Sequence, residues 1–405
     1  MSSQRTSNVR HMRRPARGYM ILVAIAAVPV LAITTACSSG TTVSGSGSGS
    51  GSTYRVGVIT AETGPLAGAG KAFLSGVDVA LDQINKDGVI GGGKKIELVK
   101  KESAEDPARS ASVAAQLASD QSILGTVCCI LSPVAGAVKP VVIGAKMPTI
   151  IYGATAVGLA QPPYVIRTTT MPQVANTAIS KFVAKEKALK TVAYVVMTDN
   201  AGIVSQGESF KKGFDEAGVK DLGQVGIVGK QTNFTSSAAT VMQKNADAIV
   251  VSATQSEAVG MIAALHDKGY KGQIVTGETV LGPGVFKSNP DALENAPFPV
   301  YFLPTETTPA GTAFATAYKT KYGTDPDDFA AQGYNALYVM AIGLKAAGDK
   351  PTRASLVKAL SGLTSVPDTI YGTVTFDGGQ LSASAGVKFV HYSKPDGVIV
   401  PWTGS

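Results

Sequence analysis

Three short polar segments of this 405-residue chain have the residue types that bind a small charged molecule. Ser132-Pro133 would open a helix, and a hydroxyl at the N-cap beside free backbone N–H groups suits a carboxylate. Gly153-Ala154-Thr155 combines a hydroxyl with two small residues, which let a ligand approach the backbone. Glu278 adds a loop carboxylate. An ordinary cap, a plain turn and a solvated loop acid are the alternative interpretations of these three segments.

Motifs for catalysis are weaker. Residues 64–71 look like a phosphate-binding loop, but the first glycine comes one residue early, and Ala72 stands where magnesium needs a Ser or Thr hydroxyl. The histidines His11, His266 and His391 are far apart in the sequence, so it contains no local metal cluster or histidine-activated nucleophile. We therefore expect a protein that is not an enzyme and needs no metal or cofactor.

Cys128 and Cys129 are adjacent, which invites a redox or metal interpretation. Adjacent Cα atoms lie about 3.8 Å apart, inside the roughly 4.4 Å lower limit for an easy disulfide. We therefore predict two small buried thiols, with a vicinal bridge as the alternative in an oxidising compartment.

The elements that must position these groups alternate between short strands and amphipathic helices. In the first half, each strand is followed by a helix or by the loop at residue 153, which predicts a parallel, doubly wound sheet. The predicted strands are residues 55–60, 95–99, 123–127 and 149–152, and the predicted helices are residues 73–84, 107–119 and 133–145.

A second strand and helix series predicts a second lobe with a parallel sheet of the same Rossmann-like kind. Its predicted strands are residues 191–196, 224–228, 248–252 and 273–276, and its predicted helices are residues 173–187, 205–217, 235–244 and 257–268. Extended proline-containing segments at residues 164–172 and 298–304 predict hinge crossings between the lobes.

The last third of the chain has predicted helices at residues 311–322, 329–347 and 353–360, then strands near residues 371–376 and 387–392. These helices must cover an existing sheet, so we expect the chain to return to the first lobe after Pro304 and to cross again near Pro367. The resulting α/β fold has lobe 1 at residues 54–170 and 303–365, lobe 2 at residues 171–302 and 366–405, and three hinge crossings.

The amino-terminal segment has the pattern of an export signal. Arginines 13, 14 and 17 precede an apolar run at residues 20–33, and small residues come before Cys37. The run is shorter than the roughly 20 residues that span a bilayer, so we expect cleavage of residues 1–36, with an uncleaved anchor helix as the alternative. Residues 37–53, rich in Ser and Gly, predict a flexible tether.

Cleavage removes five arginines and no acid, which lowers the formal net charge from +7 to +2 and removes the main argument for nucleic-acid binding.

Six motifs along the chain have a specific order and spacing: residues 54–65, 76–85, Asp106-Pro107, 153–155, Ile166-Arg167-Thr168 and 371–377. Together they resemble the type I extracytoplasmic (periplasmic) solute-binding proteins of ABC importers, in the branched-chain amino acid (leucine/isoleucine/valine) group, over roughly residues 54–402. Residues 34–37 are similar to the lipobox of bacterial lipoproteins, in which the cysteine receives diacylglycerol, although Thr34 replaces the usual leucine. The resemblance implies that Cys37 is a lipid anchor.

The resemblance also implies a ligand site in the cleft between the lobes. The carboxylate-binding hydroxyl falls on Ser132 if three extra residues are accommodated, whereas an ungapped alignment puts Cys129 there, and both options stay open. The Gly153-Ala154-Thr155 loop would hold the amino-acid head, Glu278 would pair with the ligand ammonium, and Phe329 would give an apolar contact.

Two aromatic walls of the family are missing. The loops that usually carry them contain Val204 and Thr254, which we expect to contact the ligand instead. The pocket would then be larger or differently polar than a leucine site.

We expect a monomeric, lipid-anchored receptor outside the cytoplasm that closes on a branched-chain or other hydrophobic amino acid and presents it to an ABC permease. Alternatives are a receptor for a short amide or an aromatic carboxylate, and a sensor that signals to a membrane partner. A hydrolase would turn over its ligand, whereas a receptor would return it intact.

Overall fold

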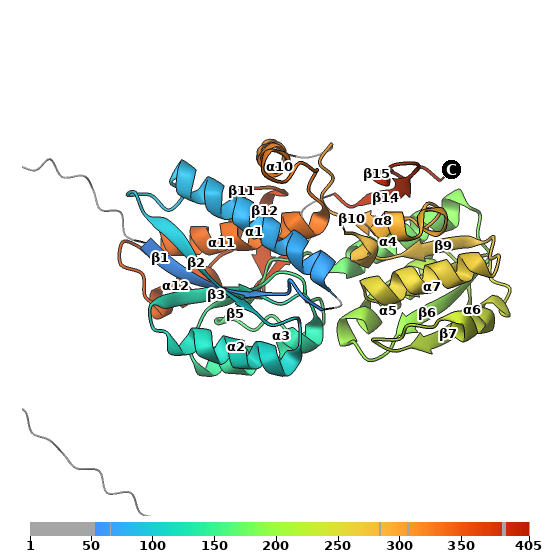
Figure 1. Ribbon diagram of the computed structural model, residues 1–405, viewed down its shortest axis with the longest axis horizontal. Coiled ribbons are helices and arrows are strands. Elements are labelled where there is room, and N and C mark those ends of the chain that lie inside the picture. Colours follow the sequence, from blue (N-terminus) through green and yellow to red (C-terminus); the bar gives the residue numbers. More distant parts are fainter. Residues whose placement is uncertain (1–52, 65, 283–284, 306–307, 383–385, 405) are drawn as a thin grey trace, which may run out of the picture. The chain divides into compact units, whose positions relative to one another are not determined.

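The computed structural model describes residues 53–64, 66–282, 285–305, 308–382 and 386–404. The expected signal, Cys37 and all but the last residue of the expected tether lie outside these residues. In the described part, no helix has the length and apolar character needed to cross a bilayer. The described residues form two α/β lobes (Figure 1).

Lobe 1 is built on an eight-stranded sheet. Five neighbouring strands, β2, β1, β3, β4 and β5, are parallel, as the strand and helix alternation predicts, and three short strands extend the sheet beyond β5. In spatial order the strands are β11 (Ser365–Thr369), β12 (Gly372–Asp377), β13 (Gln380–Ser382), β5 (Val165–Arg167), β4 (Thr149–Ile151), β3 (Ile123–Cys128), β1 (Thr53–Thr60) and β2 (Lys95–Glu102).

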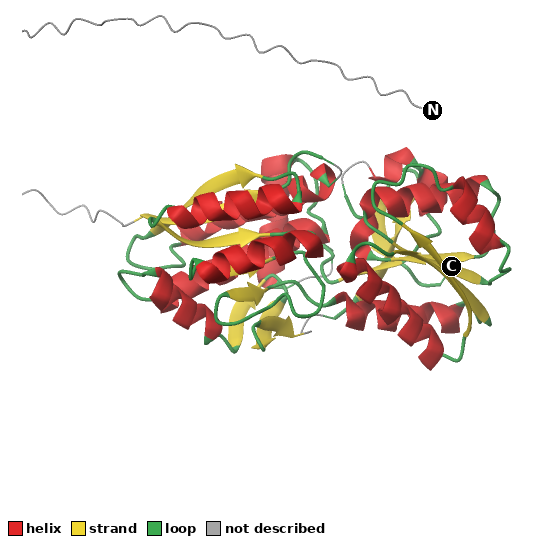
Figure 2. Ribbon diagram, turned by 90° about the horizontal axis from the view of Figure 1, so that it is seen from below, coloured by secondary structure: helices red, strands yellow, loops and turns green. Residues whose placement is uncertain are grey.

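Helices cover both faces of this sheet (Figure 2). Val56 and Val58 of β1 belong to the core formed with α1 and α11, while Ile59 belongs to the core formed with α2 and α3, as the two-residue period of a strand requires. The helices of lobe 1 are α1 (Ala67–Asp87), α2 (Pro107–Ser119), α3 (Ser132–Gly144), α10 (Pro309–Tyr322), α11 (Asp328–Ala346) and α12 (Arg353–Ser361).

Lobe 2 has a four-stranded parallel sheet and a small antiparallel sheet. The parallel sheet, in order, is β7 (Lys220–Ile227), β6 (Thr191–Met197), β8 (Ala248–Ser252) and β9 (Gln273–Thr276). The antiparallel sheet is β10 (Phe298–Val300), β14 (Lys388–Ser393) and β15 (Val398–Pro401). The helices are α4 (Pro172–Glu186), α5 (Ala201–Glu216), α6 (Thr235–Met242), α7 (Gln255–Asp267), η1 (Glu278–Val280), α8 (Val285–Ser288) and α9 (Pro290–Leu293).

The expected crossing near Pro367 is wrong. β11, β12 and β13 all belong to the lobe 1 sheet, so the chain passes to lobe 2 between β13 and β14. Pro367 is exposed on β11, the edge strand, where a missing N–H donor is tolerated. Gln380 of β13 pairs with Arg167 of β5, and its Oε1 accepts a hydrogen bond from Arg167 Nη2 at 2.6 Å. The other two crossings follow β5 and β10, inside the extended segments that the sequence predicted.

The prediction of two free thiols is also wrong, because Cys128 and Cys129 form a vicinal disulfide. β3 ends at Cys128, and Cys129 has a φ of 78°. In a continued strand the two side chains would point to opposite faces of the sheet, so this turn of the backbone brings the sulfur atoms together.

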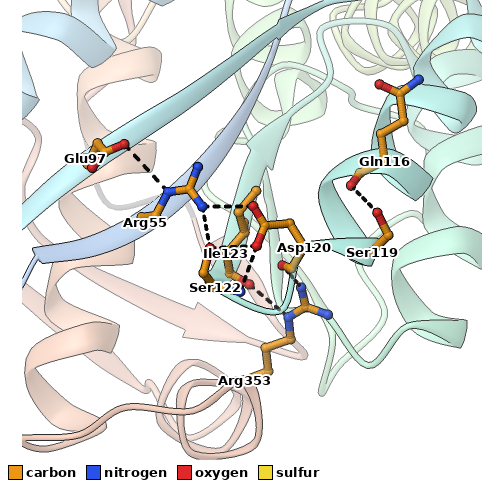
Figure 3. Close-up of polar contacts among 8 residues, drawn as sticks. All are labelled: Arg55, Glu97, Gln116, Ser119, Asp120, Ser122, Ile123 and Arg353. Atoms are coloured by element: carbon orange, nitrogen blue, oxygen red, sulfur yellow. Dashed lines mark hydrogen bonds and ion pairs between the residues drawn. The ribbon is translucent and has the colours of Figure 1, made fainter. Parts of the chain in front are cut away.

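A polar network ties the elements of lobe 1 together at the amino end of β3, the end opposite the carboxyl ends of the strands (Figure 3). Arg353 at the start of α12 donates to three backbone carbonyls: Nε to Ile123 at 2.9 Å, Nη1 to Ala118 at 2.9 Å and Nη2 to Asp120 at 2.7 Å. Arg55 of β1 pairs with the Asp120 carboxylate at 2.8 Å. The network joins α2, β1, β3 and α12 without touching the other lobe.

Candidate functional site

A cavity of about 60 Å³ lies between the lobes, at the carboxyl ends of their parallel strands. Lobe 1 contributes α1, α11 and the loops after β1, β3 and β4, and lobe 2 contributes the loops after β6, β8 and β9. The lining residues are Leu66, Ala69, Phe73, Ile130, Leu131, Ser132, Gly153, Thr155, Asn200, Gly202, Ile203, Gln206, Thr254, Gln255, Glu278, Thr279, Phe329 and Gln332.

Ser132 lies at the cavity but is not the N-cap that the sequence predicted. α3 begins at Ser132 itself, and Leu131 is the N-cap. The Ser132 hydroxyl accepts a hydrogen bond from the Ala156 N–H at 3.1 Å. This bond joins the loop after β3 to the loop after β4, so the hydroxyl stays fixed at the edge of the cavity.

An internal carboxylate binds the backbone donors that precede α3. Glu105 Oε1 accepts from the Ile130 N–H at 3.1 Å, and Oε2 accepts from the Leu131 N–H at 2.9 Å. Burial raises the pKa of Glu105 to about 7, although these two hydrogen bonds act in the opposite direction. A ligand carboxylate therefore has to find its donors further along, at Ser132 and the neighbouring loop.

The two lobes touch directly beside the cavity. Gln206 Nε2 of α5 donates to Thr155 Oγ1 of lobe 1 at 3.3 Å. Asn200 caps α5, because its Oδ1 accepts from the Gly202 N–H at 3.0 Å. A Cβ on Gly202 would lie 3.0 Å from Thr155 Oγ1 and well inside contact distance of Ser132 Oγ. The start of α5 therefore approaches lobe 1 so closely that a glycine is required.

Two carboxyl groups from opposite lobes meet beside the cavity, which Glu278 lines and Asp328 does not. Glu278 follows β9 in lobe 2, and Asp328 begins α11 in lobe 1. Gln332 Nε2 donates to both, at 3.4 Å to Glu278 Oε2 and at 3.1 Å to Asp328 Oδ2. The pKa of Glu278 is raised well above its ordinary value, first by burial and then by the negative charge of Asp328.

An apolar wall covers the lobe 1 side of the cavity. Phe73 of α1 stacks on Phe329 of α11 with 5.2 Å between ring centroids, and Phe73 also contacts Tyr152 at 4.6 Å. Ile203 contributes the apolar contact from lobe 2. The cavity thus has one acidic end, hydroxyl and amide groups along its sides, and an aromatic wall.

The structure brings six of the eight predicted ligand residues to this one cavity: Ser132, Gly153, Thr155, Thr254, Glu278 and Phe329. Ala154 does not line it, because its carbonyl accepts from the buried Arg167 and its N–H donates to the Cys129 carbonyl. Val204 does not line it either, and Ile203 takes its place. Ligand contact by any of them stays a prediction.

Sequence reasoning missed Gln206, Gln332 and Asp328. Gln206 and Gln332 lie on predicted helices and Asp328 immediately precedes one, and a polar residue in such a position is normally solvent-exposed. Asp328 and Gln332 are four residues apart and therefore on one face of α11, and Gln332 is three residues from Phe329; this spacing was the available signal.

A second cavity of about 470 Å³ continues from the first, sharing Leu66, Leu131, Asn200 and Thr254. Its further lining includes Glu105, Asp199 and Glu257. Thr254 is one of the two places where the sequence lacks an aromatic wall, whereas Val204, the other, lines neither cavity. The open space next to the site is consistent with the larger pocket that we expected.

A periplasmic binding protein family model matches residues 53–394. The Leu/Ile/Val-binding protein homolog 6 of Brucella suis is 26% identical over 324 residues, which cover 76% of this chain and 80% of the relative. The Leu/Ile/Val-binding protein BraC3 of Rhizobium johnstonii is 25% identical over 351 residues, covering 85% and 92%.

Solved structures share the fold. A leucine-binding protein from Thermotoga maritima has a TM-score of 0.78 at 21% identity, with 86% of this chain and 98% of that chain covered. A branched-chain amino acid substrate-binding protein from Streptococcus pneumoniae, in complex with isoleucine, has a TM-score of 0.74 at 24% identity, covering 86% and 97%. A solute-binding protein from R. palustris, in complex with 4-hydroxybenzoate, has a TM-score of 0.75 at 22% identity, covering 86% and 95%. At these identities the likeness shows the fold alone.

Proposed function

Because the chain belongs to the periplasmic binding protein family, with the type I fold that its sequence predicts, we propose that it is the substrate-binding protein of an ABC importer and binds a branched-chain or other hydrophobic amino acid between its lobes. This family consists of extracytoplasmic binding proteins rather than enzymes. The ligand assignment rests on the chemistry of the cavity and on the relatives named as Leu/Ile/Val-binding proteins.

The observation that carries the proposal is the distribution of groups around the cavity. Glu278 is the acid for the ligand ammonium, Ser132 and Thr155 offer hydroxyl donors to its carboxylate, and Phe73 and Phe329 offer an apolar surface to its side chain. A zwitterion with an apolar side chain needs this combination. The nearby second cavity leaves room for side chains longer than that of leucine.

Binding would favour the closed arrangement of the lobes. Ligand contacts from both lobes add to the direct contacts between Gln206 and Thr155 and between Gln332 and Glu278. A ligand shifts the equilibrium by its difference in affinity between the open and closed states. The permease would then distinguish the loaded receptor from the empty one by its shape. Residues 1–36 would be removed as an export signal, and a lipid on Cys37 would hold the monomeric receptor at the outer face of the membrane.

A ligand panel tests the proposal. Thermal shift and titration calorimetry would compare leucine, isoleucine, valine, phenylalanine and methionine with 4-hydroxybenzoate and a short amide. We expect saturable binding of at least one amino acid and no turnover of the recovered ligand by mass spectrometry. Binding of 4-hydroxybenzoate or the amide, with no amino acid bound, would refute the ligand assignment while leaving the receptor fold intact.

A further inference from the structure

Glu278 and Asp328 form a carboxyl pair across the cleft. Glu278 belongs to lobe 2, whereas Asp328 and Gln332 belong to α11 of lobe 1. One amide nitrogen, Gln332 Nε2, donates to both carboxyl groups, so closure of the lobes brings the two acids together. Asp328 is 1% exposed and cannot turn away into solvent.

None of the described residues that line the cavity is Lys, Arg or His, and Lys319, which lines the separate cavity that Asp328 reaches, pairs with Asp325 at 3.1 Å. The titratable groups that act on the pair are Asp327 at the start of α11, Tyr301 after β10 and Tyr371 after β11. All three are acids, and the two tyrosines, whose pKa burial raises further above physiological pH, stay neutral. The closed, empty cleft therefore needs a positive charge that these surroundings do not supply.

Glu278 is the member of the pair that takes up a proton. Burial and Asp328 raise its pKa well above the ordinary value, and the protonated carboxyl donates to Asp328. The pKa of Asp328 is also raised by burial, but bonds from Glu278, Gln332 and the N–H groups of Phe302 and Tyr301 favour its charged form. When the lobes separate, water replaces these contacts and both carboxylates ionise.

We propose that Glu278 and Asp328 together form a cation-dependent latch: the lobes close when an ammonium group of the ligand lies at the pair, or when a proton takes its place. Asp328 is then a specificity-determining residue that selects ligands with an ammonium group over carboxylic acids that lack one. The inference rests on the proposed function, because it concerns the same cleft and names the chemical group that the ligand must carry.

The direction of the pH dependence of binding follows from whether the ligand brings its own positive charge. L-leucine brings its own positive charge, so its binding near neutral pH requires little net proton uptake. 4-Methylpentanoate, which is leucine without the amino group, closes the cleft only with uptake of one proton. Its affinity should therefore rise about tenfold for each pH unit of acidification, while the affinity of leucine changes little.

The ligand-free protein gives the first test. Small-angle scattering from about pH 8.5 to about pH 5.5 covers the range in which a carboxyl with a raised pKa takes up its proton. We expect the wild type to become more compact as the pH falls. Glu278→Gln should be compact across the range, because its amide donates to Asp328 without a proton. A wild-type radius of gyration that stays constant, equal to that of Glu278→Gln, would overturn the latch.

Calorimetry gives the second test, with L-leucine and 4-methylpentanoate titrated in two buffers of different ionisation enthalpy to count protons. Asp328→Asn keeps an acceptor for Gln332 Nε2 but removes the second charge. We expect it to reduce the preference for leucine over 4-methylpentanoate by about tenfold or more, which is equivalent to a shift of at least one pKa unit. Asp82→Asn, at an exposed carboxylate of α1, makes the same charge change away from the cleft and should leave the preference unchanged.

The outcomes separate the two proposals. A purely structural role of Asp328 would weaken both ligands equally and leave the proton count unchanged, which would refute the specificity role. If no amino acid binds, the proposed function fails, but the scattering of the ligand-free protein still decides whether the latch exists.

Discussion

Gly202→Ala should prevent full closure of the lobes without harming either lobe. Gly202 lies in the first turn of α5, and an added Cβ would meet Ser132 Oγ and Thr155 Oγ1 of the opposite lobe. Rotation of Ser132 is not a free escape, because its hydroxyl accepts from the Ala156 N–H. The methyl group therefore separates the lobes by several tenths of an ångström or more at this contact.

The expected loss of ligand affinity follows from the contacts between the lobes that such a separation would break. The hydrogen bonds from Gln206 to Thr155 and from Gln332 to Glu278 each contribute about 0.5–1.5 kcal/mol, and more where a charged group takes part. Losing both costs about 1–3 kcal/mol, which corresponds to a loss of affinity of about 5-fold to 150-fold. Alanine is a better helix former than glycine, by up to about 1 kcal/mol, so the melting temperature of the empty protein should not fall.

Titration calorimetry and a thermal melt of the same samples would check that the ligand affinity falls while the melting temperature does not. Gly136→Ala is the matched control, because it lies inside α3 and its added Cβ has no atom within 4 Å. We expect the control to keep full affinity. Unchanged affinity in Gly202→Ala would refute the view that this contact limits closure.

Three further perturbations separate binding from stability. Glu278→Gln should cost about 2–5 kcal/mol of affinity for an amino-acid ligand, the scale for a buried charge pair, and equal affinity by calorimetry would remove its role as ammonium partner. Arg353→Ala should lower the free energy of unfolding by about 1.5–3 kcal/mol, because hydrogen bonds from a charged group to three carbonyls are lost. Since Arg353 lies away from the cleft, a change in ligand affinity would contradict this purely structural role. Burial raises the pKa of Glu105 to about 7, so its protonated form contributes stability that is fully present below about pH 4.5 and is lost as the pH rises through about 7. The full contribution is about 3 kcal/mol, and Glu105→Gln should flatten this fall in urea unfolding at several pH values; an equally steep fall would contradict the assignment.

Periodicity predicted most elements because their burial pattern is local. β8, β9 and α2 have the bounds expected from the sequence, α3 and α4 are shifted by one residue, and α10 begins two residues earlier than expected. β11, β13 and β15 were not predicted, since strands of three to five residues carry little hydrophobic alternation, and β11 and β15 are also sheet edges. The last crossing was misplaced because a proline suggested a hinge, whereas long-range pairing of Gln380 with Arg167 decided the lobe.

The site was predictable where residues follow strands directly. The loops after β3, β4, β8 and β9 all reach the cavity, because the carboxyl ends of parallel strands share one edge. Asp328 could not be assigned to the site from its position in the sequence, since its partner Glu278 comes from the other lobe. The vicinal disulfide depends on the positive φ of Cys129, which its residue type does not indicate.

A crystal structure of the protein with its bound amino acid would show where each ligand group lies. We expect the ligand in the cavity between the lobes, with its ammonium nitrogen about 2.7–2.9 Å from a carboxylate oxygen of Glu278 and its carboxylate at Ser132 and Thr155. A ligand bound outside this cavity, or bound there with its carboxylate against Glu278 and Asp328, would refute the proposed binding site.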